Sequence, residues 1–126
     1  MKRALDIATT VLTSLLLLAF VILVLRGLID PQQASARFGA PVSDAAGALF
    51  YRVYLSRNLV IVAAGAVFLL SRQWTALAIL LTIAAFLPLF DMSMLALDGV
   101  TPPALHPIAL ALTAALLWRR ARAARP

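Results

Sequence analysis

The chain has 126 residues, of which 63% are hydrophobic and 13% are charged. Soluble domains have about 45–50% apolar and about 25% charged residues, so this composition excludes a soluble globular protein and predicts a single integral membrane domain over residues 1–126. The net charge of +6 comes from basic residues beside apolar segments. This placement indicates contact with membrane lipids that carry anionic headgroups, and no nucleic acid is expected as a partner.

Four segments are candidates for a membrane crossing, which requires about 20 helical residues, and the fourth is short enough to need its preceding residues or some thinning of the bilayer. We expect spans over 4–25, 45–70, 74–97 and 102–118, with an outer loop over 27–44. The first span exceeds the apolar core of a signal peptide, about 7–15 residues, so we expect it to be retained. Because lipid excludes unpaired backbone amides, the spans are predicted to be helices. The expected fold is an all-α membrane protein, a four-transmembrane-helix bundle.

The outer loop is rich in Pro, Gln, Ala, Ser and Gly, with turn or helix-start signals at Asp30–Pro31 and Ser43–Asp44. We expect a short helix at the membrane interface. Two interpretations stay open. The loop is either a plain connector on the headgroups, which we favour, or a lid whose residues 38–41 fold over the outer mouth of the bundle.

Basic residues lie mostly on one side of the expected spans. That side carries Lys2, Arg3, Arg72, Arg119, Arg120, Arg122 and Arg125, whereas the other side has only Arg26 and Arg37. The positive-inside rule therefore puts both termini in the cytoplasm of a multi-pass protein, which we expect in the bacterial cytoplasmic (inner) membrane. Asp6 is expected either to pair with Lys2 and Arg3 or to stabilise the N-terminus of the first helix.

Three ionisable side chains, Arg57, Asp91 and His106, interrupt different apolar segments. A charge in the hydrocarbon costs about 2.5–3.5 kcal/mol on insertion scales, so such residues are expected to face the protein interior. At ~1.5 Å per helical residue they lie about 22, 25 and 18 Å from the cytoplasmic helix ends. We expect them to converge near the outer leaflet.

Further polar residues accompany Arg57 on the same predicted helix. Tyr51, Tyr54, Arg57 and Asn58 follow one another at helical spacing and are expected to line the same face. Pro88 is expected to bend the third span near Asp91 or to leave a backbone carbonyl free there, because proline lacks a backbone donor. Pro107 indicates that His106 lies in the first turn of the fourth span.

Two classes of function fit these residues. In the first, the protein binds a lipophilic or amphipathic small molecule through Arg57, Asn58, Tyr51 and Tyr54. Asp91 and His106 then act as tentative acid and base in a reaction such as an isomerisation or cyclisation. Whether the protein is an enzyme stays open, because Arg57 and Asp91 can equally form a structural ion pair between two helices.

In the second class, the protein is a non-catalytic accessory subunit that packs against other helices of a larger membrane complex, or against copies of itself. Small residues that permit close helix approach favour this class. They are Ala63, Ala64 and Ala66 on the second span and Ala109, Ala111, Ala114 and Ala115 on the fourth. The chain has no cysteine and one histidine, and it contains no nucleotide or haem motif, so neither a metal nor a cofactor is expected.

Several short stretches follow a known layout. They are Arg26–Gly27–Leu28–Ile29–Asp30–Pro31, Arg37–Phe38–Gly39–Ala40–Pro41, Tyr54–Leu55–Ser56–Arg57–Asn58, Gly65, the late aspartate Asp91, and His106. This layout resembles small uncharacterised bacterial four-helix integral membrane proteins, distantly DoxX-like. The resemblance implies a four-helix bundle and no settled activity. It also implies an acidic residue directly after Arg57, the arginine of the second span. This chain has Asn58 at that position, which leaves Asp91 as the counter-ion of Arg57.

Overall fold

In the described part of the chain, helices are the only regular secondary structure. The computed structural model describes residues 2–101 and 105–124, apart from the side chains of residues 105 and 106. The helices are α1 (Lys2–Ile29), α2 (Pro31–Phe38), α3 (Ala45–Leu70), α4 (Trp74–Ala84), α5 (Phe86–Leu97) and α6 (Leu105–Ala123). The predicted all-α class is confirmed for these residues.

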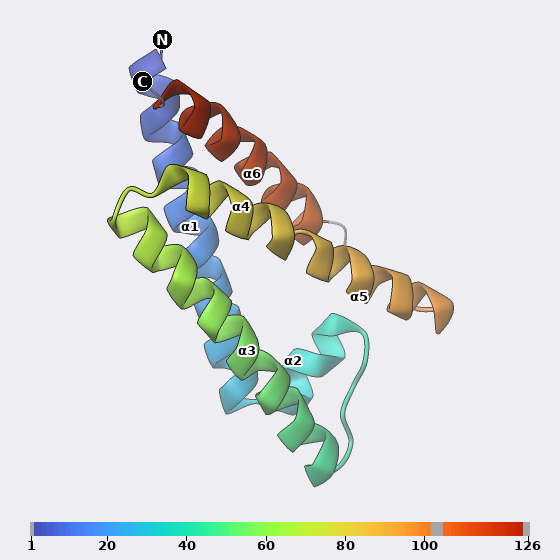
Figure 1. The fold of residues 1–126 in the computed structure, drawn as a ribbon. Coiled ribbons are helices and arrows are strands. Elements are labelled where there is room, and N and C mark those ends of the chain that lie inside the picture. Colours follow the sequence, from blue (N-terminus) through green and yellow to red (C-terminus); the bar gives the residue numbers. More distant parts are fainter. Residues whose placement is uncertain (1, 102–104, 125–126) are drawn as a thin grey trace.

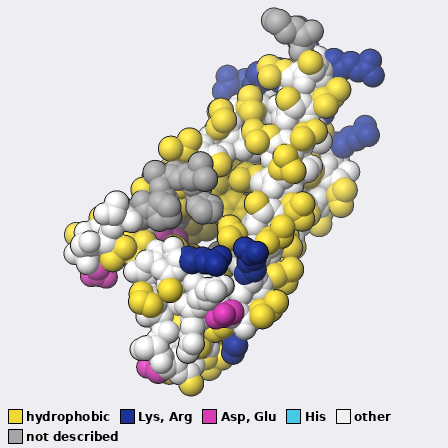
Figure 2. Space-filling view, turned by 180° about the vertical axis from the view of Figure 1, so that it is seen from behind, with side chains coloured by type: hydrophobic (Ala, Val, Ile, Leu, Met, Phe, Trp, Pro, Cys, Tyr) yellow, Lys and Arg dark blue, Asp and Glu magenta, His cyan; other side chains and the backbone are white. Residues whose placement is uncertain are grey.

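Three stretches of the described chain are long and apolar enough to cross a membrane: α1, α3 and the continuous segment Trp74–Leu97 formed by α4 and α5. Their outer faces carry many exposed leucines, isoleucines, valines and phenylalanines. Figure 2 shows yellow hydrophobic side chains over most of one face of the molecule. An apolar surface of this extent matches hydrocarbon and not water, so the protein is a multi-pass membrane protein.

The helices pack as two antiparallel pairs that diverge. α1 packs along α3, and α4 packs along α6, while the N-terminus and C-terminus lie at the same end of the molecule (Figure 1). The core lies between α4 and α6, where Leu77, Leu81, Leu110 and Leu117 are almost fully buried. With increasing distance from the end that holds the two termini, the two helix pairs separate. The backbone of α5 approaches neither α2 nor α3.

A helix break separates α4 from α5 at Ala85. Pro88 lies three residues later and has no N–H to donate to the carbonyl of Ala84, so one backbone hydrogen bond of the helix is missing there. Ala85 itself keeps helical backbone angles, and α5 continues roughly along the line of α4 (Figure 1). The bend expected at Pro88 stays a prediction.

Two glycines allow α1 and α3 to pack closely. A Cβ at Gly65 would lie 2.9 Å from Cδ2 of Leu17, and a Cβ at Gly27 would overlap Cδ1 of Leu55. Arg52 Nε adds a hydrogen bond of 3.1 Å to the carbonyl of Leu28 near the end of α1. Small residues at such contacts bring backbones together, which is the main source of packing energy between helices in lipid.

The outer loop contains α2, which its own hydrogen bonds hold in place. The Asp30 carboxylate caps its start by accepting from the Gln33 amide at 2.9 Å. Gly39 ends it in the left-handed conformation, with φ of 100°. The fully buried Ser35 accepts a hydrogen bond of 3.0 Å from the amide of Val42. α1 itself continues to Ile29, so the loop begins later than expected.

Polar side chains join α1, α4 and α6 near the two termini; we call Asp6, Thr10, Trp74, Arg119 and Arg120 the terminal cluster. Arg119 Nη2 lies 2.8 Å from the Asp6 carboxylate. Arg120 donates to the Asp6 carbonyl at 2.7 Å and to Thr10, and its guanidinium lies 3.6 Å from the Trp74 ring centroid. The expected pairing of Asp6 with Lys2 and Arg3 is wrong, because packing brings α6 beside the start of α1.

Candidate ligand-binding cavity

All six helices contribute to a cavity of about 300 Å³, which we call the central cavity. It lies where the two helix pairs diverge, and it is partly open. Val100, just after α5, touches Gly39 at the end of α2 and so limits the cavity toward the outer loop. The backbones of α3 and α5, which both line the cavity, do not approach each other.

The lining changes in polarity along the helix axes. The apolar base, nearest the core, consists of Leu17, Phe20, Val62, Leu81 and Leu110. The polar belt, farther from the core, consists of Tyr51, Tyr54, Asn58 and Asp91. The charged rim, at the end of α1 and on α2, consists of Arg26, Asp30, Gln33 and Arg37. This gradient suits a molecule with one polar end and one apolar end.

One hydrogen bond of the polar belt crosses between the diverging pairs. The Tyr54 hydroxyl on α3 donates to Oδ2 of Asp91 on α5 at 3.2 Å, and both residues are half-buried. The Tyr51 ring stacks near the Tyr54 ring, with centroids 6.1 Å apart. Hydroxyl donors to carboxylates usually lie about 2.5–2.7 Å away, so the Tyr54–Asp91 bond is long. A ligand group that donates a hydrogen bond could take the place of the hydroxyl at Asp91.

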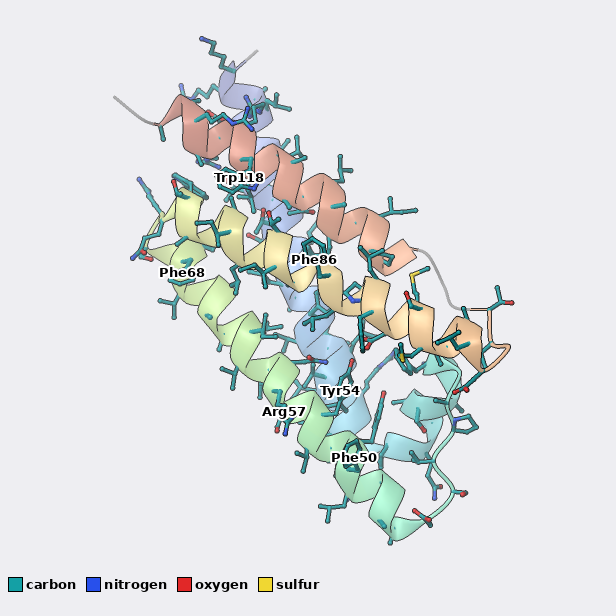
Figure 3. The ribbon with its side chains drawn as sticks, turned by 45° about the vertical axis from the view of Figure 1, so that its right-hand side comes forward. Phe50, Tyr54, Arg57, Phe68, Phe86 and Trp118 are labelled. Carbon is teal, nitrogen blue, oxygen red and sulfur yellow. The ribbon has the colours of Figure 1, made fainter. Side chains whose placement is uncertain are left out.

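Arg57 lies outside this site. Its side chain is exposed, it does not line the central cavity, and it forms no ion pair with Asp91 among the described residues. Figure 3 shows Tyr54 on the edge of α3 that faces α1 and Arg57 on the outer edge. The expected convergence of Arg57 with Asp91 is therefore wrong, and so is the structural ion pair between them.

The physical reason is the angle around α3. At about 100° per residue, Tyr51 and Asn58 lie within about 60° of Tyr54, whereas Arg57 lies about 60° away on the opposite side. The helix face predicted from the sequence is too wide, because only three of its four residues line the cavity. The long arginine side chain then reaches outward from that edge.

His106 belongs to the first turn of α6, as expected from Pro107, but its side chain lies outside the described residues. Pro107 itself is buried and lines the central cavity. The acid–base role assigned to His106 therefore stays a prediction. Among the residues that the structure describes, no three His, Asp or Glu side chains gather as a metal site would require.

Comparison with known proteins identifies the family. The model of a family described as "Domain of unknown function (DUF4267)" matches residues 17–120. The chain belongs to this family. The matched region includes every residue that lines the central cavity. No match was found among curated proteins or among solved structures.

The DUF4267 match agrees with the expected membership of an uncharacterised family, while the DoxX-like resemblance and the bacterial origin stay predictions. The charged rim of the site was not predicted. Charges in a loop are expected to be solvated, so the sequence around Arg26 and Arg37 did not indicate that they line a cavity. The helix-start pattern at Asp30–Pro31 was the available clue, because it predicts the helix that turns Arg37 toward the cavity.

Proposed function

We propose that the protein binds a lipophilic or amphipathic small molecule in the central cavity, near the outer leaflet of the bacterial cytoplasmic membrane. The observation that carries this proposal is the polarity gradient of the lining from the apolar base to the charged rim. Small-molecule sites are typically concave and mostly apolar, with a few convergent polar groups. A mostly apolar lining suits a ligand that is dissolved in the membrane better than one that is dissolved in water.

We also propose that α6 forms a fourth span and that both termini are cytoplasmic. The shared end of the two termini supports this arrangement (Figure 1). So does the cluster of Arg119, Arg120 and Arg122 at the end of α6, where a helix leaving the membrane on the cytoplasmic side is expected to carry basic residues. The charged rim then lies at the outer headgroup level.

The polar belt suits proton transfer to or from a bound molecule. In this proposal Asp91 is the base, His106 is the acid, and the hydroxyls of Tyr51 and Tyr54 with the amide of Asn58 orient the ligand. The long Tyr54–Asp91 hydrogen bond supports the assignment, because a ligand proton can take the place of the tyrosine proton at Oδ2. An isomerisation or cyclisation needs only such a pair.

Filling the cavity tests the binding function. Ala84 lines the central cavity, whereas Ala63 is exposed on α3. We expect Ala84→Phe to abolish a bound mass that native mass spectrometry detects on the wild-type protein released from a mild detergent. Ala63→Phe should retain that mass. A second filling variant, Ala34→Leu on α2, guards against misfolding of the first.

The proposal is wrong if the wild-type protein carries no bound molecule and neither lipid extract nor filling variant changes its thermal stability. Stoichiometric co-purification of other membrane proteins would instead favour the accessory-subunit function. Exposed Ala63, Ala111 and Ala115 are compatible with that alternative. Ala114 is not available to a partner, since it is buried in the core between α4 and α6.

A further inference from the structure

The charged rim has unpaired donors. Among the described residues, the guanidinium groups of Arg26 and Arg37 make no ion pair and no hydrogen bond. Both side chains line the central cavity, one from the last turn of α1 and the other from the last turn of α2. Both residues are exposed, and they lie at the mouth of the cavity on different helices, with no partner among the described residues.

The acceptors in the same cavity are already engaged. Asp30 accepts from the Gln33 amide at the start of α2, where the helix dipole further stabilises its charge. Asp91 accepts from Tyr54. Each carboxylate thus has one recorded donor, whereas the two guanidiniums have no acceptor among the described residues, so the arginines are the charged groups of the lining that are free to bind an anionic group.

The positions of the charged and apolar residues along the cavity also determine the orientation of a bound ligand. Arg26 and Arg37 lie at the loop end of the cavity, and the apolar base lies toward the core. A lipid in the same leaflet has the same order, with its headgroup at the interface and its chain inward. A molecule with this order can enter the cavity from that leaflet without turning over.

We propose that the central cavity takes a single-chain amphiphile with an anionic headgroup, which Arg26 and Arg37 bind while the chain lies on the apolar base. This inference rests on the proposed binding function and names its ligand class. A carboxylate and a phosphate share the required chemistry, because each accepts two parallel hydrogen bonds from a guanidinium. The two headgroups are separate arms of the test.

The first experiment compares headgroups on one chain length. Labelled palmitate is bound to the full-length protein in phosphatidylcholine nanodiscs at a pH where palmitate is ionised. Unlabelled palmitate, hexadecyl phosphate, hexadecanol or hexadecyltrimethylammonium then competes for the site. We expect palmitate or hexadecyl phosphate to compete at least about tenfold better than hexadecanol, and the cationic amphiphile to compete least. The better of the two anions identifies the headgroup.

The second experiment removes the charges. Arg26→Gln and Arg37→Gln are each expected to weaken binding of the anionic amphiphile about tenfold, which corresponds to about 1.4 kcal/mol. Binding of hexadecanol should stay within twofold. Arg57→Gln is the matched control, because it removes the same charge from an exposed position outside the cavity. It should leave both affinities unchanged.

The outcomes separate this inference from the proposed function. Equal competition by hexadecanol and palmitate, or equal effects of Arg57→Gln and the two rim variants, would overturn the anionic headgroup while leaving a lipophilic site. If no amphiphile binds and Ala84→Phe changes nothing, the binding function itself fails. Circular dichroism and elution as a single species establish that each variant is folded.

Discussion

At the scale of single residues, Asp91 is the least compatible with its surroundings. It is half-buried in an apolar segment and forms no ion pair among the described residues. Its recorded side-chain partner is the Tyr54 hydroxyl at 3.2 Å. Losing that donor leaves a carboxylate whose desolvation is poorly compensated, a situation that costs more than the hydrogen bond itself contributes.

We therefore expect Tyr54→Phe to destabilise the protein by about 1 kcal/mol, a typical size for a polar contact between membrane helices. Tyr51→Phe is the control, because no hydrogen bond of its hydroxyl is recorded among the described residues. Adding Asp91→Asn to Tyr54→Phe should remove most of the difference. Thermal unfolding in mild detergent measures all four proteins, and equal midpoints for the two tyrosine variants would contradict the expectation.

Tyr54 and Asp91 could be singled out from the sequence because polar groups in an apolar span are costly wherever they lie. The partner of each could not, since partners depend on how far each helix is rotated. Arg57 shows this limit. It lies about 60° from Tyr54 around the axis of α3, on the side away from Tyr51 and Asn58, and so falls outside the cavity face. The Asp6–Arg119 pair shows it too, as its members lie at opposite ends of the chain.

At the scale of helices, the interruption at Ala85 lies beside the central cavity. α5 continues roughly along the line of α4, and both diverge from α3 on the way from the loop between α3 and α4 (Figure 1). Both Ala84 and Pro88 line the cavity. The break itself was predictable from Pro88, but the direction of α5 after it was not, because proline removes a hydrogen bond without selecting a unique bend.

Pro88→Ala restores the missing N–H and should rejoin α4 and α5 into one helix. We expect the distance distribution between spin labels at the exposed positions Phe50 and Leu97 to shift, as measured by electron paramagnetic resonance. Pro41→Ala, in the loop before α3, is the control and should leave the distribution unchanged. An unchanged distribution in Pro88→Ala would mean that packing, not proline, sets the direction of α5.

At the scale of the whole molecule, the two ends differ in how they are held. The terminal cluster joins α1, α4 and α6, and nearby Trp118 donates to Thr82 at 2.9 Å across the core. Toward the outer loop the helix pairs separate around the central cavity. The all-helical class and the approximate spans follow from hydropathy alone, but this difference between the ends arises from packing that hydropathy does not encode.

Asp6→Asn is expected to lower the midpoint of thermal unfolding, because it removes a charged acceptor from Arg119 and leaves two neighbouring arginines less compensated. Partial exposure of both partners limits the effect to about 1 kcal/mol. Asp98→Asn removes the same charge from an exposed position after α5 and should change the midpoint little. Equal shifts in both variants would show that the terminal cluster does not stabilise the fold.

The separation of α3 from α5 has a consequence for the protein in its native surroundings. Among the described residues, only the Tyr54–Asp91 hydrogen bond is recorded between these two helices, whose backbones do not approach each other, so we expect neighbouring acyl chains to complete the wall of the cavity. Occupancy then depends on competition with bulk lipid as well as on intrinsic affinity. In stiffer or thicker bilayers, lipid chains enter the cavity less readily, so the specific ligand would compete better against bulk lipid.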